Sequence, residues 1–143
     1  MMIDDKGQIS LEYLLIFAVS LILLIAFTLP LSQMAIERTG DVSNALNVKG
    51  ELSKLSGAIS QVYAEGQGSR QTVYLDVNKP VYVKITNSYI SASVKMSDGK
   101  SKTLTLNHNS NFASGGISLD KGENKIIVEW PIGEEKMTLY KKY

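Results

Sequence analysis

The chain contains no cysteine, and its 143 residues include only one histidine, one tryptophan and three prolines. Without cysteine there can be no disulfide bond, no thiolate metal site and no cysteine nucleophile. An exported domain of this composition must therefore be stabilised by core packing or by docking on another surface. The net charge of +1 gives no electrostatic reason to expect nucleic acid as a partner.

Side chains that could form a catalytic or metal site are also scarce. His108 lies between two asparagines, and we expect it in an exposed loop because zinc would need further ligands that the sequence lacks. Serine and the acidic residues have no base beside them that would activate a nucleophile. Gly115-Gly116 is too short to surround a phosphate, and there is no N-x-S/T glycosylation sequon. We therefore predict that the chain is not an enzyme and has no catalytic residue, cofactor or metal ion.

One long apolar run dominates the N-terminal third of the chain. It extends from Tyr13 to Leu31 and is interrupted only by Ser20, Thr28 and Pro30. No charged residue occurs anywhere within it. A membrane-spanning helix needs about 20 predominantly apolar residues to cross about 30 Å of hydrocarbon. The run is therefore long enough for a bilayer or for the water-free centre of a helical assembly.

The residues before the run, Lys6 to Glu12, do not form an ordinary secretory signal. Such a signal has a basic start, a shorter apolar core and a small-residue cleavage site after that core. Here the first seven residues are acidic overall, and no such site follows the run. Any cleavage should therefore precede the run, where Lys6-Gly7 lies, because glycine has no side chain to obstruct a peptidase.

The sequence KGQISLE at residues 6–12, followed by the apolar run, resembles the class III signal peptide of archaeal type IV pilin-like proteins. Gln8, Ser10 and Glu12 match the family pattern Q-x-S-x-E-x-x-x-L, and Ile16 replaces its final leucine. The resemblance implies a cytoplasmic leader, residues 1–7, which a prepilin peptidase removes. The processing motif then comprises Lys6, Gly7, Gln8, Ser10 and Glu12.

The same resemblance implies an assembly role for the start of the mature chain. In this family the glutamate equivalent to Glu12 is thought to contact the free N-terminal amine of a neighbouring subunit. The alternative is that Ser10 caps the helix and Glu12 only favours its first turn. The assembly residues implied by the family are Glu12, Tyr13, Leu14, Leu15, Phe17, Leu21, Leu24, Phe27 and Pro30.

We expect the helix to continue beyond Pro30, where it would be kinked, as the helix of bacterial pilins is; the alternative is a helix end at Leu29. Continuation is favoured by an apolar stripe at spacings of three and four, formed by Ala45, Val48, Leu52, Leu55, Ile59 and Val62. The opposite face carries Lys49, Glu51, Lys54, Ser56 and Ser60. A local break is expected at Thr39-Gly40-Asp41, and the helix end near Ala64. The stripe should pack on a C-terminal domain, or alternatively form a two-stranded coiled coil.

After Ser69 the apolar period changes to two, which predicts short β-strands. The runs are Thr72–Val77, Val81–Thr86, Ile90–Met96, Leu104/Leu106, Ile117/Leu119, Ile126–Trp130 and Met137–Tyr140. Ser97-Asp98-Gly99-Lys100 predicts a type I′ hairpin turn, and Asn107–Gly116 predicts a loop. The tyrosines Tyr74, Tyr82, Tyr89, Tyr140 and Tyr143 are expected to pack or to lie on the sheet surface, with a shared binding surface as the alternative.

Together these patterns predict an α+β fold with a long, kinked N-terminal helix and a C-terminal antiparallel β-domain on its second half. The expected parts are a leader at 1–7, an assembly helix at 8–65 with its apolar run at 13–31, a linker at 66–70 and a β-domain at 71–143.

The resemblance implies a subunit of an archaeal cell-surface pilus that supports attachment. Its partners would be the membrane before assembly, the prepilin peptidase, the pilus assembly platform and other copies of itself. The alternatives are a permanently anchored extracellular binding module and a minor pilin or pseudopilin of an export machine.

Overall fold

The computed structural model of the chain describes residues 5–143, so the first four residues of the expected leader lie outside it. The chain divides into two compact units, 1–39 and 40–143, which we call unit 1 and unit 2. The elements of the described part are α1 (Asp5–Glu65), β1 (Arg70–Val77), β2 (Val81–Ile85), β3 (Tyr89–Lys95), β4 (Ser101–Asn107), β5 (Gly115–Leu119), β6 (Gly122–Glu129) and β7 (Thr138–Lys142). The predicted α+β class, a long helix followed by antiparallel sheets, is confirmed.

The helix α1 is continuous through both positions at which an interruption was considered. It contains Pro30 in its interior, so the alternative of a helix end at Leu29 is wrong. It also passes through Thr39-Gly40-Asp41, so the local break expected there is wrong as well. A single glycine costs only about 1 kcal/mol in a helix, which a long hydrogen-bonded helix tolerates. The kink at Pro30 stays a prediction.

The end of α1 is set by glycine, as the sequence indicates. Gly66 adopts a φ of 88°, and its N–H donates to the Val62 carbonyl at 3.1 Å. A left-handed residue of this kind closes many helices because only glycine adopts it without steric cost. The Ser69 hydroxyl adds a second donor to the same carbonyl at 2.9 Å. Arg70, the last residue of the expected linker, already belongs to β1.

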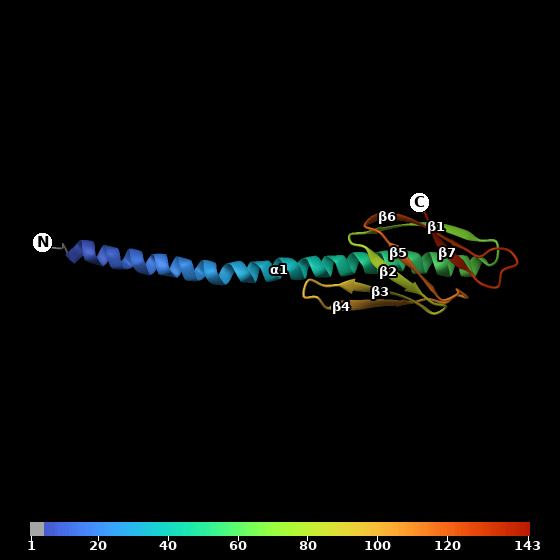
Figure 1. Cartoon of the computed structure of the whole chain (residues 1–143), viewed down its shortest axis with the longest axis horizontal. Helices are drawn as coiled ribbons and strands as arrows, with labels where there is room; N and C mark the ends of the chain where they lie inside the picture. The colour runs from blue at the N-terminus through green and yellow to red at the C-terminus, as the bar shows by residue number, and fades with distance from the viewer. Residues whose placement is uncertain (1–4) are drawn as a thin grey trace. The chain divides into compact units, whose positions relative to one another are not determined.

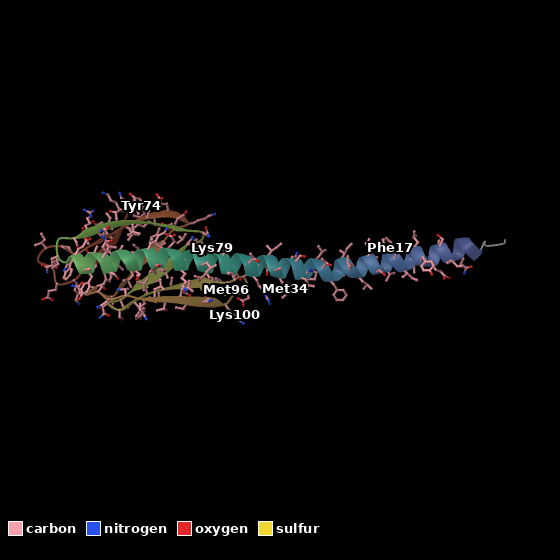
Figure 2. The ribbon with its side chains drawn as sticks, turned by 180° about the vertical axis from the view of Figure 1, so that it is seen from behind. Phe17, Met34, Tyr74, Lys79, Met96 and Lys100 are labelled. Atoms are coloured by element: carbon pink, nitrogen blue, oxygen red, sulfur yellow. The ribbon has the colours of Figure 1, made fainter. Side chains whose placement is uncertain are left out.

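Unit 2 contains two antiparallel sheets, one with strand order β1-β6-β7 and one with order β4-β3-β2-β5. In Figures 1 and 2, β1 and β6 lie along one side of the C-terminal half of α1, and β3 and β4 lie along the other. All seven predicted strand regions are confirmed. The chain crosses from the first sheet to the second between β1 and β2, and returns between β5 and β6.

The core of unit 2 forms where the apolar stripe of α1 meets both sheets. Every residue of the predicted stripe is buried, which excludes the coiled-coil alternative for this part of the chain. The stripe contributes Val48, Leu52, Leu55, Ile59 and Val62 to the same hydrophobic cluster as the inward side chains of the strands, and α1 adds Ala58 to it. The helix therefore supplies one wall of the core, and the β-domain is not complete without it.

Glu51 was expected on the exposed face of α1, and this prediction is wrong because its side chain is buried. Its carboxylate accepts a hydrogen bond from the Asp76 N–H at 3.0 Å and from Lys54 at 2.7 Å. Asn47, one turn earlier, donates to the Asp76 carbonyl and accepts from the Asn78 N–H. Strand β1 is an edge strand, so these two helix side chains satisfy backbone groups that no neighbouring strand pairs.

The hairpin between β3 and β4 is present, but the predicted type I′ turn is wrong. A type I′ turn needs a positive φ at both central residues, whereas only Gly99 has one, at 82°. The Gly99 N–H donates to the Met96 carbonyl at 3.1 Å, and the Met96 N–H donates to the Lys100 carbonyl at 2.8 Å. This pattern fits a type I turn followed by a glycine bulge. The turn is held against α1 by Asp41, whose carboxylate accepts from the Ser97 N–H and hydroxyl.

The predicted loop at 107–116 is shorter than expected, because Asn107 ends β4 and the two glycines begin β5. Gly116 lies directly beside Tyr82. A Cβ at Gly116 would lie 2.0 Å from the Tyr82 hydroxyl oxygen, so a larger residue would require the Tyr82 ring to move. Tyr74 and Tyr82 belong to different sheets. This arrangement fits tyrosines that pack or lie on separate sheet surfaces better than it fits one shared binding surface.

Candidate functional site

The candidate site is the apolar part of α1 in unit 1, together with the motif that precedes it. The apolar side chains of this segment are exposed, and those larger than alanine are 47–72% exposed from Ile9 to Ile36. Figure 2 shows two of them, Phe17 and Met34, projecting away from the helix. So large an exposed apolar surface is unusual for a monomeric soluble protein and indicates a contact with lipid or with other protein.

Three hydroxyl side chains in and directly after the apolar run are bonded within the helix. The hydroxyls of Ser20, Thr28 and Ser32 donate to the carbonyl four residues earlier, at 2.7, 2.6 and 2.9 Å. Inside hydrocarbon an unsatisfied polar group would cost several kcal/mol, so this internal bonding removes the main penalty for burying the segment. The helix is long and apolar enough to cross a membrane, judged by its length and composition.

Glu12 is the charge that stands at the start of this apolar surface. Its side chain is exposed, and it forms no ion pair with any other side chain of residues 7–143. The next charged residue, Glu37, follows only after the apolar run. A lone carboxylate at the border of a lipid-sized apolar segment is costly unless it gains a partner or stays in water. Within this one chain, nothing described supplies such a partner.

The motif residues Gly7, Gln8 and Ser10 all lie inside α1, which begins at Asp5. The alternative in which Ser10 caps the helix is therefore wrong, because the helix starts about a turn earlier. The expected cleavage point, between Gly7 and Gln8, is helical in this state. A Cβ added at Gly7 would meet no atom within 4 Å, and its φ is not positive. The folded chain thus gives no packing or backbone reason for glycine at this position.

His108 was expected in an exposed loop, but it is half-buried, and its two ring nitrogens have no hydrogen-bond partner among the described residues. Its backbone N–H donates to the Ser88 carbonyl at 2.9 Å. Burial lowers the pKa of His108 below its ordinary value, and the Tyr89 backbone acts more weakly in the opposite sense. No group of three or more metal-ligating side chains occurs in the described part of the chain. His108 is therefore a packed side chain whose burial favours the neutral form of the ring.

This environment makes the stability of unit 2 pH-dependent. The unfolded chain takes up a proton at His108 more readily than the folded chain, so protonation favours unfolding. We expect the melting temperature to fall as the pH drops through about 6.5, the ordinary histidine pKa, toward the lower folded value. The His108→Gln variant should lose this part of the dependence in thermal unfolding at pH 5 and pH 8. An identical pH profile in the variant would contradict the assignment.

Comparison with known proteins bears on the N-terminal segment alone. Residues 6–31 match the family model described as Class III signal peptide. No curated protein and no solved structure matches the chain. The match covers the motif and the whole apolar run, and it is consistent with a type IV pilin-like protein. It supports a chain that enters the membrane as a precursor, is processed by a prepilin peptidase and is exported as a pilin-like or pseudopilin protein.

Proposed function

We propose that this chain is a structural subunit of an archaeal cell-surface pilus, cleaved after Gly7 and assembled through its N-terminal helix. The single observation that carries the proposal is the apolar surface of unit 1. That surface is exposed along its whole length, its hydroxyls are internally bonded, and it directly follows a class III processing motif. A permanent anchor would need the apolar surface, but it would not need the motif.

In the proposed mechanism the apolar run has two successive partners. It spans the bilayer in the precursor, and after cleavage it leaves the lipid and packs laterally against the same segment of other copies. Helix association inside lipid has little hydrophobic driving force, because the lipid tails are as apolar as the side chains. The assembly platform therefore sets the direction in which subunits are added. The ion pair between Glu12 and the new N-terminal amine of Gln8 on a neighbouring copy sets the register of the packed helices. The β-domains then cover the filament and contact surfaces.

The Glu12→Gln variant tests this mechanism. Removing the carboxylate leaves the neighbour's amine without a partner in an apolar environment, and breaking a buried ion pair costs about 3–5 kcal/mol. We expect the variant to be processed normally but to yield at least about tenfold fewer filaments. The readouts are mass spectrometry of the N-terminus and electron microscopy of surface filaments.

Glu37→Gln is the matched control, because Glu37 is the first charge after the run and is also exposed. It should assemble like the wild type. Normal filaments in Glu12→Gln would contradict the role of Glu12. Recovery of the wild-type chain only in membranes, with residues 1–7 still attached, would instead support the permanently anchored binding module.

A further inference from the structure

The loop between β6 and β7 presents an apolar side chain and two acidic side chains at one end of unit 2. Ile132 is 84% exposed at the tip of a turn in which Gly133 has a φ of 87° and the Glu134 N–H donates to the Pro131 carbonyl. Glu134 and Glu135 follow directly, and both are exposed. Within residues 7–143 neither carboxylate takes part in an ion pair.

Side-chain hydrogen bonds hold the backbone of this loop, while the side chains of Ile132, Glu134 and Glu135 are exposed. The Glu134 carbonyl accepts from the Trp130 indole at 2.8 Å and from the Gln67 amide at 2.9 Å. The Glu135 carbonyl accepts from Asn111 at 2.7 Å. Because these bonds already fix the backbone of the loop, binding has to order only the three exposed side chains.

A groove of complementary character lies between α1 and the unpaired edge strand β4. Its volume is about 300 Å³, and its lining comprises Ala45, Leu46, Lys49, Lys102, Thr103, Leu104, Thr105 and Leu106. An engineered cavity of about 150 Å³ admits a benzene-sized molecule, so this groove can receive an isoleucine side chain with space to spare. Leu46, Leu104 and Leu106 supply apolar contacts for it. Lys49 and Lys102 are exposed, and no ion pair with an acid of the described residues involves them.

We propose that the loop at 131–135 of one copy docks in the α1–β4 groove of a second copy. Ile132 enters the apolar groove, and Glu134 and Glu135 pair with Lys49 and Lys102. Figure 1 shows the connection between β6 and β7, in red, at the end of unit 2 where α1 ends, and the gold hairpin between β3 and β4 at the opposite end. Leu46 precedes Gly66 by about 20 residues, which is about 30 Å along a helix.

The two surfaces are therefore different and lie far apart on the same unit. Such a contact is heterologous, and it continues from copy to copy when the rotation does not close a ring. The inference rests on the proposed function, and it identifies which part of the β-domain joins successive subunits. In the filament, this contact between the outer β-domains would act together with the packing of the apolar helices.

Cysteine cross-linking tests the contact on filaments of the full chain, which has no cysteine of its own. The variant Leu46→Cys/Ile132→Cys should give, after oxidation, a ladder of covalent multimers in a denaturing gel. The matched control Leu46→Cys/Thr72→Cys places the second thiol on exposed β1 and should stay monomeric. A single dimer band would indicate a symmetric contact and would overturn the head-to-tail arrangement.

Charge reversal gives a second, independent readout. Lys49→Glu/Lys102→Glu should reduce filament yield about tenfold, and adding Glu134→Lys/Glu135→Lys in the same chain should restore it. Lys84→Glu/Lys121→Glu, which reverses exposed lysines elsewhere, should have no effect. If the wild type forms filaments, but the Leu46→Cys/Ile132→Cys variant gives no ladder and charge reversal leaves the yield unchanged, this inference is overturned and the proposed function stays intact. Absence of wild-type filaments would overturn both.

Discussion

Replacing Gly7 with valine should leave the chain unprocessed, with residues 1–7 still attached. The expected loss of cleavage is at least an order of magnitude, because a β-branched side chain next to the scissile bond obstructs a site that accepts glycine. The variant should still form α1, since a Cβ at Gly7 meets nothing within 4 Å and valine is a slightly better helix former than glycine. Intact mass spectrometry of the membrane-extracted protein measures the processed fraction.

Gly50→Val is the matched control for this experiment. Gly50 is another glycine of α1 with open space around its Cβ, but it lies well beyond the signal peptide match. It should be processed as the wild type is. If Gly7→Val is also trimmed normally, the cleavage site is not between Gly7 and Gln8, and the assignment of the leader is wrong.

Replacing Leu55 with alanine should destabilise unit 2 more than any exposed substitution in the same helix. Leu55 is fully buried at the point where α1 meets both sheets. Truncating a fully buried leucine typically costs about 2–5 kcal/mol, from the lost burial and the cavity that remains. For a unit of about 100 residues each kcal/mol lowers the melting temperature by about 4–8 °C, so a fall of about 10 °C or more is expected.

Leu46→Ala is the control, because it is the same change on the same helix at a side chain that is 63% exposed. It should shift the melting temperature of the detergent-solubilised chain by no more than a few degrees. Equal melting temperatures for Leu55→Ala and the wild type would contradict the conclusion that the helix forms one wall of the core.

The sequence predicted the periodic parts of this fold well, and the reason is physical. The spacing of Val48, Leu52, Leu55 and Ile59 places these residues on one face of a helix, and all four are buried. Alternation located every strand in the same way. Alternation defines which face of a strand is inward but not its neighbours, so the orders β1-β6-β7 and β4-β3-β2-β5 could not be predicted.

The errors arose where a local pattern competed with tertiary contacts. Glu51 borders the apolar stripe, and an unpaired N–H on β1 draws its carboxylate into the structure. At the β3–β4 hairpin, Asp98-Gly99 fits two turn types, and the turn that forms is docked on Asp41, far away in sequence.

The candidate site and the two proposed docking surfaces differ in how directly the sequence shows them. The motif from Lys6 to Glu12 and the apolar run are contiguous, so they were visible directly, and the family match covers both. The complementary surfaces at Ile132 and at the α1–β4 groove were not visible. Ile132-Gly133 indicated only a turn, and the groove combines residues more than 50 positions apart. An isolated aliphatic residue in a turn, followed by two acids, was the one available signal.

Helical reconstruction of purified surface filaments, with mass spectrometry of their subunit, tests the central claim most directly. We predict that the filaments consist of this chain and that each subunit begins at Gln8. The residues from Tyr13 to Leu31 should pack against the same segment of other copies at the filament centre, with the β-domains outside. Recovery of the chain only in membrane fractions, with residues 1–7 retained and no filament containing it, would contradict the claim.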